Sequence, residues 1–210
     1  MQLYYHPYGC SLAPAIVAAE AGIDLDFVYV DIIGEPHRLA DGVLYSEINA
    51  RNYVPLLGLD DGTEVSEAGI IVQYLADVNP AAGLAPAHGT TERGELNQWL
   101  TFLGTELHKT YSPWLFHPEV GELAQDYARK RVAARYAIVE KQLEGRAWLL
   151  GESFTVADAY LFVMVNWAAA AKTPLADFPN IRAWFERMKA RPQVRAAIKL
   201  HSVSPTAQAA

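Results

Sequence analysis

The residue best suited to chemistry in this 210-residue chain is its single cysteine, Cys10. It lies between a short β-type run at residues 2–5 and a helix-forming run at residues 11–21, so we expect its thiol at the N-terminus of a helix. The amides and the dipole at that end favour a thiolate, and they lower cysteine pKa values from ~8.5 to roughly 3.5–7.5. The alternative is a buried structural cysteine, which is common among free cysteines.

The residues that follow Cys10 restrict this chemistry further. The run Cys10-Ser11-Leu12-Ala13 lacks the second cysteine of a Cys-x-x-Cys redox site, and the chain has no other cysteine. Any thiol–disulfide exchange must therefore proceed through a mixed disulfide with another molecule, for which a small thiol is the natural partner. Ser11 offers a hydroxyl that can bond to a thiolate, although helix capping explains this serine almost as well.

The elements around Cys10 predict an α/β domain over residues 1–79. A strand, a helix and a second strand come first, an order for which parallel pairing is the default. Asp60-Asp61-Gly62 then gives a strong hairpin signal between two further strands, and a helix follows. This order is that of a thioredoxin-like domain. We expect strands at residues 2–5, 26–32, 54–59 and 64–66, and helices at residues 11–21 and 67–79.

The remainder of the chain predicts helices alone. Residues 80–89 form a linker whose prolines and glycines discourage regular structure, and residues 90–210 are expected to form an all-α domain. Within it, Thr155 and Asp158 form a capping box at the start of the most apolar helix, which is a structural role. We expect a first helix that ends near Pro113, and further helices at residues 119–144, 155–171, 178–190 and 192–199.

Two further positions have residue types suited to ligand binding. Val54-Pro55 opens the third strand, where a proline often marks a cis peptide that exposes the preceding backbone; a trans proline is the alternative. Glu67 and Ala68 open the helix after the hairpin, where free amides suit a carboxylate and Glu67 suits an ammonium group. An acid that the dipole favours in the first turn is the competing interpretation of Glu67.

The helical domain offers Glu106 and His108. In an α-helix these two side chains point about 160° apart, so they do not easily serve one small pocket. Thr101 and His108, seven residues apart, are expected to share a face. His108 is then placed to face a pocket against the first domain, and Glu106 to face a neighbouring subunit. A surface or core role is nevertheless the commoner one for a lone histidine.

Composition and charge narrow the function classes. The net charge is −7 and the pI about 5.3, without a long basic run, which disfavours nucleic-acid and membrane-surface partners. The N-terminus lacks a signal-peptide pattern, and the most apolar segment falls short of the ~20 residues that span a bilayer. A single cysteine suits a reducing compartment, so we expect a cytoplasmic protein. No metal-ligand spacing, phosphate loop, dinucleotide glycine pattern or nucleophile elbow is present.

Several of these motifs together resemble the beta-class glutathione transferases of bacteria, over nearly the whole chain from Met1 to about Leu200. Cys10 together with Glu106-Leu107-His108-Lys109 selects this class, whereas Val54-Pro55 and the capping box occur throughout the superfamily. The other matching runs are Leu3-Tyr4-Tyr5, Asp60-Asp61-Gly62-Thr63, Gln73-Tyr74-Leu75-Ala76-Asp77, and the segment from Phe154 to Phe162.

The resemblance implies a thioredoxin-like domain followed by a helical bundle, assembled as a homodimer that uses glutathione and no metal. It implies that Cys10 lies against the glutathione sulfur and can form a mixed disulfide with it. If Cys10 is inert, Ser11 and Tyr5 become the candidate catalytic residues. The resemblance also implies that His108 borders the electrophile pocket. The candidate glutathione-binding residues are the Val54 backbone with Tyr53 and a cis Pro55 for the peptide, Glu67 and the Ala68 amide for the γ-glutamyl end, His37, Arg38 or Arg51 for the glycine carboxylate, and Thr101 and Glu106 across the dimer.

Three departures from the family pattern bear on affinity and substrate choice. Ala68 lacks the hydroxyl found at that position in many members, Ala15 replaces a histidine, and Thr101 replaces an asparagine.

The leading hypothesis is an enzyme that conjugates reduced glutathione to small hydrophobic electrophiles. Tyr111, Trp114 and Trp167 are candidate walls for the electrophile, although each is more often a core residue. The first alternative is a glutathione-dependent disulfide reductase or dehalogenase that works through a Cys10 mixed disulfide. The second is a non-catalytic protein that binds hydrophobic ligands.

Overall fold

The computed structural model describes residues 1–203 and divides the chain into two compact units. The first unit comprises Met1–Ala82 together with helix α8 (Pro192–His201), and the second comprises Gly83–Arg191. The boundary follows a 3-10 turn, η2 (Pro80–Ala82), inside the expected linker. The expected helical domain included α8, whereas the structure groups α8 with the first unit, because it packs on the first helix of that unit.

A five-stranded mixed sheet lies in the first unit, in the order β3-β2-β1-β4-β5. The central strand β1 pairs in parallel with β2 and antiparallel with β4, and β5 completes the predicted hairpin with β4. The sequence does not predict β3, since a two-residue strand shows no periodicity. The strands are β1 (Gln2–Tyr5), β2 (Asp26–Asp31), β3 (Arg38–Leu39), β4 (Leu56–Gly58) and β5 (Glu64–Ser66).

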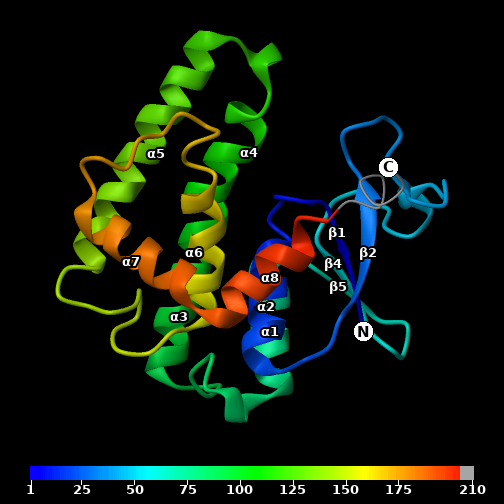
Figure 1. The fold of residues 1–210 in the computed structure, drawn as a ribbon, viewed down its shortest axis with the longest axis horizontal. Helices are drawn as coiled ribbons and strands as arrows, with labels where there is room; N and C mark the ends of the chain where they lie inside the picture. Colours follow the sequence, from blue (N-terminus) through cyan, green and yellow to red (C-terminus); the bar gives the residue numbers. More distant parts are fainter. Residues whose placement is uncertain (204–210) are drawn as a thin grey trace. The chain divides into compact units, whose positions relative to one another are not determined.

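Helix α1 (Leu12–Ala21) packs against both α2 (Ala68–Val78) and α8 (Figure 1). Eight of its ten residues are buried, and four of these are alanines, whose small side chains let neighbouring helices approach closely. Gly22 ends the helix as expected, in the left-handed conformation with φ of 66° that glycine adopts readily. The start of α1, where Cys10 lies, is therefore held by packing along the whole helix.

Helices make up the second unit. In its described residues no strand occurs, and Trp148 and Gly151 form an isolated bridge. No described helix of the chain is long and apolar enough to cross a membrane. The elements are α3 (Thr91–Phe102), the π-helical turn η3 (Leu103–His108), α4 (Lys109–Leu115), the 3-10 turn η4 (Pro118–Val120), α5 (Glu122–Gln142), α6 (Val156–Asn166) and α7 (Pro179–Ala190).

The π-helical turn η3 interrupts the segment that was expected to be one α-helix up to Pro113. Its hydrogen bonds run from residue i to i+5, so each turn holds more residues and the faces beyond it are rotated. Thr101 is accordingly exposed while His108 is buried, and the prediction that they share a face is wrong. The predicted divergence of Glu106 from His108 is confirmed, because Glu106 contacts α5 and His108 contacts α6.

Helix α6 is the core of the second unit, with every residue from Val156 to Val165 buried. The predicted capping box at its start is present, and the Thr155 N–H donates to the Asp158 carboxylate at 2.9 Å. The carboxylate also accepts the Leu149 N–H and the Trp184 indole N–H, each at 2.9 Å. Asp158 thus connects the start of α6 to the preceding loop and to α7.

The regular part of α6 ends at Asn166, earlier than the expected residue 171. Turns continue beyond it and close in a Schellman motif, in which Lys172 has a left-handed φ of 57°. The Thr173 N–H donates to the Ala168 carbonyl at 2.9 Å, and the Lys172 N–H donates to the Ala169 carbonyl at 3.2 Å. The helical turns that follow α6 therefore end at this Schellman motif, next to the expected last residue 171.

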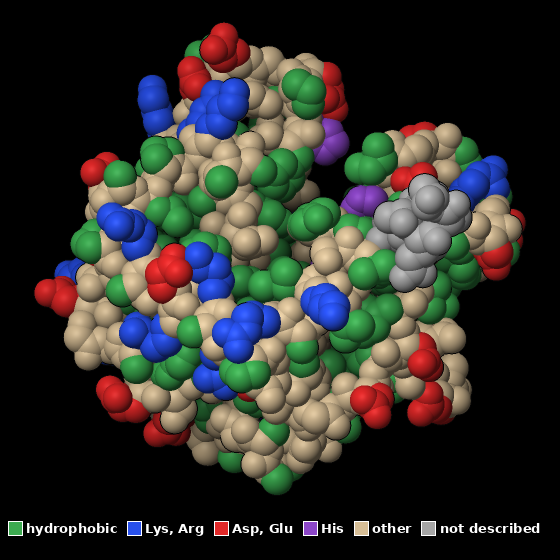
Figure 2. All heavy atoms as spheres, viewed as in Figure 1, with side chains coloured by type: hydrophobic (Ala, Val, Ile, Leu, Met, Phe, Trp, Pro, Cys, Tyr) green, Lys and Arg blue, Asp and Glu red, His purple; other side chains and the backbone are tan. Residues whose placement is uncertain are grey.

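Positive charge gathers on the second unit, although the whole chain is acidic. Figure 2 shows Lys and Arg side chains clustered over helix α7. Two arginines at its C-terminal end lie over aromatic rings: Arg191 is 4.4 Å from the Phe154 ring centroid, and Arg187 is 5.7 Å from that of Trp148. These cations are stabilised by cation–π contacts, which the sequence pattern does not reveal.

Replacement of Asp158 is expected to destabilise the second unit strongly. Asp158→Ala leaves three buried N–H donors without an acceptor, and should lower the free energy of unfolding by about 3–5 kcal/mol in urea denaturation. Asp158→Asn keeps one acceptor oxygen and should lose less. As a control, Asp126→Ala removes a surface ion pair and should change the stability little. Equal losses in the Asp126 and Asp158 variants would contradict this account.

Candidate active site

Cys10 lies in the tight turn that joins β1 to α1. The Gly9 N–H donates to the His6 carbonyl at 3.0 Å, and the Leu12 N–H donates to the Gly9 carbonyl at 3.2 Å. A Cβ at position 9 would lie 3.0 Å from the His6 oxygen, so a side chain there would require that carbonyl to shift by a few tenths of an ångström. The Cys10 side chain is half-buried at the N-terminal end of α1, as predicted from its position between strand and helix.

The Cys10 thiol donates to the Val54 carbonyl, with 3.5 Å between Sγ and the oxygen. The Val54–Pro55 peptide is cis, which is one of the two alternatives that a proline at a strand start leaves open and the one that the family resemblance implies. Strand β4 begins only at Leu56, so the Val54 backbone lies outside the sheet pairing, next to the thiol. Residues 44 positions apart in the sequence thus form one site.

Glu67 immediately precedes helix α2 in an unusual backbone conformation. Its φ is 69° and its ψ is 118°, which a non-glycine residue adopts only at a conformational cost of about 1–3 kcal/mol. Its side chain is exposed, and its carbonyl accepts the N–H groups of Ile70 and Ile71, each at 2.9 Å. Residues held in this way concentrate at ligand clamps. Ala68 begins the helix and is buried, so its backbone is the part suited to a ligand.

The segment before Val54 is fixed by hydrogen bonds from its own neighbourhood. The Tyr53 carbonyl accepts the Tyr45 hydroxyl at 2.9 Å and the Asn49 amide at 2.8 Å, while the Tyr53 side chain is exposed. The Arg51 guanidinium donates to the Ser66 hydroxyl, next to Glu67. Arg51 therefore lies beside the start of α2 rather than being free to move with its loop.

His37 and Arg38, the other candidates for a carboxylate, have different surroundings. The His37 ring is hydrogen-bonded to the Asn52 carbonyl at 3.1 Å and lies 3.2 Å from the Glu35 carboxylate. Arg38 is on β3 and donates to the Gly42 carbonyl at 2.7 Å. His37 is thus tied to the segment that precedes Val54, whereas Arg38 is tied to its own hairpin.

Ser11 and Tyr5 are turned into the interior of the first unit. Ser11 is fully buried, and its hydroxyl lies 2.8 Å from the His201 Nε2. The Tyr5 hydroxyl donates to the Val203 carbonyl at 2.6 Å. Burial, with Tyr29 nearby, raises the pKa of Tyr5. Both side chains serve internal contacts, which differs from the expected role beside a thiolate. No local sequence pattern marks His201 as the partner of Ser11, from which it is 190 residues away.

In the second unit, His108 is buried in an aromatic cluster. Its Nδ1 lies 2.8 Å from the Tyr160 hydroxyl, and its ring contacts that of Trp167 at a centroid distance of 5.3 Å. Burial, with a smaller contribution from Lys109, lowers the pKa of His108 to about 4. His108 is therefore neutral at neutral pH.

Glu106 and Thr101 lie outside this cluster. The Glu106 carboxylate accepts bonds from Arg135 and, at 3.5 Å, from Arg131. The Arg135 hydrogen bond and charge lower the pKa of Glu106. Its charge is compensated within its own chain, while Thr101 is exposed on α3. The contact of either residue with a partner subunit stays a prediction.

Only one of the three expected electrophile walls has an open surface. Tyr111 is fully buried, with its hydroxyl bonded to those of Tyr136 and, at 2.8 Å, Thr173, and Trp167 is nearly buried. Trp114 is 44% exposed.

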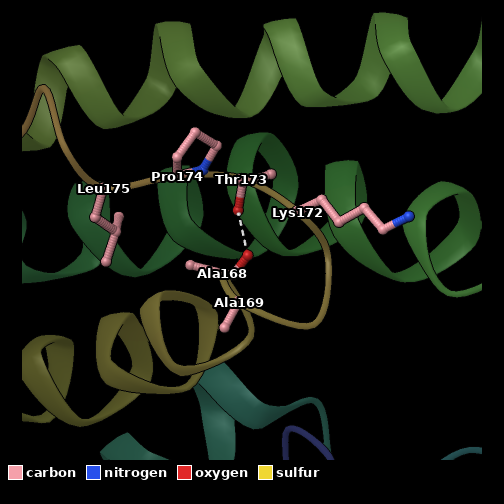
Figure 3. A pocket seen from close by; sticks show the side chains of 6 residues that line it. All are labelled: Ala168, Ala169, Lys172, Thr173, Pro174 and Leu175. Carbon is pink, nitrogen blue, oxygen red and sulfur yellow. Dashed lines mark hydrogen bonds between the residues drawn. The ribbon is translucent and has the colours of Figure 1, made fainter.

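The turns after α6 line an open cavity of about 480 Å³, where Thr173 and Ala168 are hydrogen-bonded (Figure 3). In the described residues, no group of three His, Cys, Asp or Glu side chains is placed to hold a metal ion.

The chain matches proteins of known family over nearly its whole length. Residues 102–192 match the model of the glutathione S-transferase C-terminal domain. The chain is 38% identical, over 94% of its length, to glutathione S-transferase GstA of Escherichia coli O157:H7, of which it covers 97%.

Solved structures agree with this match. The ternary complex of BphK, a bacterial GST, has a TM-score of 0.93 and 41% identity over 97% of this chain and 100% of that one. Two further structures each have a TM-score of 0.91 and 38% identity, over 97% of this chain and 100% of theirs. They are a sphingomonad glutathione S-transferase complexed with glutathione and a bacterial beta-class glutathione S-transferase of Sphingomonas chungbukensis.

The mixed five-stranded sheet followed by helices is the glutathione S-transferase fold, and in this chain Cys10 lies at the start of the first helix. The chain belongs to the glutathione S-transferase family. It is a glutathione S-transferase of the beta class, the class that Cys10 and the Glu106–Lys109 run imply.

The buried neutral histidines are expected to make the protein lose stability as the pH falls from 6.5. The folded state holds His108 with a pKa of about 4, below 6.5 in the unfolded chain, so the unfolded state binds more protons in this range. The free energy of unfolding should fall by on the order of 2 kcal/mol between pH 7.5 and pH 5 through His108. Urea denaturation of the native chain and of His108→Gln checks this, since the variant should lose less. The same decrease in both would contradict a buried neutral His108.

Proposed function

We propose that this glutathione S-transferase binds reduced glutathione on its first unit, with Cys10 against the glutathione sulfur, and transfers the thiolate to small hydrophobic electrophiles. The observation that carries this proposal is the 3.5 Å contact between the Cys10 thiol and the Val54 carbonyl, beside a cis proline. A thiol at a helix start thereby lies next to a backbone segment that can pair with a peptide, and glutathione is a peptide with a thiol.

Each part of glutathione has a complementary group near this contact. The Val54 backbone would pair with the central peptide, flanked by Tyr53 and Pro55. The start of α2 would receive the γ-glutamyl end, its amides binding the carboxylate and the exposed Glu67 binding the ammonium. Of the basic candidates, His37 suits the glycine carboxylate, because its ring is tied to the segment before Val54. Arg51, which lies next to Ser66, suits the γ-glutamyl side.

The chemistry assigned to the chain is stabilisation of a glutathione thiolate. The N-terminal amides of α1 and its dipole supply a fixed partial positive charge near Cys10, which favours an anionic sulfur without reorganisation. The sulfur then attacks the electrophilic carbon and displaces the leaving group. Ser11 is not assigned to this step, because its hydroxyl is buried and bonded to His201. His108, as a neutral hydrogen-bonding group, is assigned to the electrophile.

A redox activity uses the same thiol and is the second candidate. The Cys10 thiolate would attack a substrate disulfide, forming a mixed disulfide with one half and releasing the other half as a thiol. One reduced glutathione would displace the bound half as a second thiol, leaving a Cys10–glutathione mixed disulfide, and a second reduced glutathione would restore the Cys10 thiol and leave as oxidised glutathione. The half-buried Cys10 at the peptide-pairing segment favours this reaction, since no second cysteine competes for the mixed disulfide.

The proposal includes a homodimer in the cytoplasm, acting in detoxification. Tyr53, next to Val54, and Ile70, three residues after Glu67, expose 67% and 53% of their surfaces. Large apolar side chains beside a binding site support a covering partner, here a second copy of the chain. A single cysteine and a reduced thiol substrate support a reducing compartment.

Cys10 is expected to be the sole site of glutathione attachment. Incubation with oxidised glutathione should add one glutathione to the native chain in intact-mass analysis, and dithiothreitol should remove it. Cys10→Ala should form no adduct, and its kcat/KM for conjugating a chlorinated dinitrobenzene should fall by about 10- to 100-fold, the effect of a lost hydrogen bond to a charged group. An unmodified native chain, together with unchanged conjugation by Cys10→Ala, would contradict the proposal. If Cys10→Ala loses disulfide reduction but retains conjugation, the result would favour the redox candidate.

The dimer is expected to depend on the exposed apolar side chains beside the proposed glutathione site, Tyr53 and Ile70. Sedimentation should give a particle of two 23.2 kDa chains for the native protein. Ile70→Glu places a charge among these side chains and should give a single chain, since an unpaired charge in an apolar interface is strongly unfavourable. Ile33→Glu, at an 81% exposed position after β2, is the matched control and should leave the dimer intact. A monomeric native protein would rule the dimer out.

A further inference from the structure

The last described helix, α8, is hydrogen-bonded to the turn that carries Cys10. His201, at the C-terminal end of α8, places its Nε2 2.8 Å from the Ser11 hydroxyl oxygen. Both side chains are buried, Ser11 at 0% and His201 at 1% exposure, so water does not compete for the bond. Ser11 directly follows Cys10 and precedes the first residue of α1.

The Ser11 hydroxyl is surrounded by internal partners. Besides the His201 ring, its oxygen accepts the His6 N–H at 3.4 Å, and it lies 3.4 Å from the His6 carbonyl. Its single proton goes either to the ring nitrogen or to that carbonyl. In both cases the Ser11 hydroxyl is hydrogen-bonded within the first unit, so its role is to stabilise the turn.

A second contact fixes the same end of α8 on the other side of the turn. The Tyr5 hydroxyl donates to the Val203 carbonyl at 2.6 Å, and the Tyr5 ring packs on the His201 ring with 5.2 Å between centroids. Tyr5 ends β1, just before the turn, and Ser11 follows it. The end of α8 therefore holds both borders of the segment that contains Cys10.

His201 remains neutral in this position. Burial, with His6 nearby, lowers the pKa of His201 to about 3. A neutral ring has one donor and one acceptor nitrogen, so the bond to Ser11 persists over the whole neutral range. His201 accordingly supplies a fixed contact, without a change of charge.

We propose that His201 is a positioning residue of the transferase: through Ser11 it fixes the turn at the start of α1, and so sets the orientation of the Cys10 thiol beside the Val54 carbonyl. For glutathione binding, this inference rests on the proposed place of Cys10 at the glutathione sulfur. The intrinsic reactivity of Cys10 is a separate property, and it can be measured without glutathione.

The test compares variants that remove the Ser11–His201 bond with one that retains it. His201→Leu and Ser11→Ala remove it, whereas His201→Gln keeps a polar atom near the Nε2 position. The first readout is the rate of Cys10 alkylation by iodoacetamide as a function of pH, which is specific because the chain has one cysteine. The second readout compares the change in the KM for glutathione with the change in the KM for the electrophile.

Loss of the bond should slow Cys10 alkylation at pH 7 by about three- to tenfold, the usual effect of one hydrogen bond, and should shift its pH profile upward. The KM for glutathione should rise by a similar factor, with the KM for the electrophile unchanged. His201→Gln should stay within about twofold of the native protein. The double variant of Ser11 and His201 should lose no more than either single variant, because both remove one bond.

A matched control separates positioning from general loss of stability. Val194→Ala shortens a buried side chain of α8 that has no hydrogen-bonding role, and should leave alkylation and both KM values unchanged. A native alkylation profile in His201→Leu, or an equal change in Val194→Ala, would overturn the inference. If His201→Leu does not fold, Ser11→Ala and His201→Gln decide in the same way. Altered alkylation with an unchanged glutathione KM would retain the role of His201 and reject Cys10 as the glutathione contact.

Discussion

The burial of helix α1 is the constraint on which the candidate active site depends. Its alanine-rich surface is covered by α2 and α8, and its first turn is bonded to the end of α8 through Ser11. A helix packed along its length cannot shift its N-terminus without disturbing close-packed neighbours. The thiol of Cys10 and the dipole of α1 are therefore presented together, at a fixed place beside Val54.

The second unit depends on a different polar group, the buried carboxylate of Asp158. It fixes the start of α6, and α6 in turn provides Tyr160 to the His108 ring. Glu106 and His108 lie on opposite faces of the π-helical turn before α4, so Glu106 contacts the arginines of α5 and His108 enters an aromatic cluster. The change in helical period places His108 on a different face from Thr101, which is exposed.

Electrostatics around the proposed chemistry come from fixed dipoles more than from titrating side chains. Burial keeps both His108 and His201 neutral at neutral pH. Neither ring then brings a positive charge toward a thiolate, and both act as hydrogen-bonding groups of constant charge. Backbone amides at a helix start need no reorganisation when negative charge develops on a sulfur. The strained Glu67, at the start of α2, fits the same pattern of a preset binding surface.

The sequence by itself determined the features whose signals are local. Cys10 between strand and helix, the hairpin at Asp61 and the Asp158 capping box follow from turn chemistry, capping and backbone preference over a few residues. Only the tertiary structure decided that Ser11 pairs with His201, 190 residues away, and that α8 belongs with the sheet. It also decided the rotation of His108 into the core. These features depend on packing between segments that are distant in the sequence, because this packing decides which faces are buried. A buried polar group must then form its hydrogen bonds with the elements that surround it.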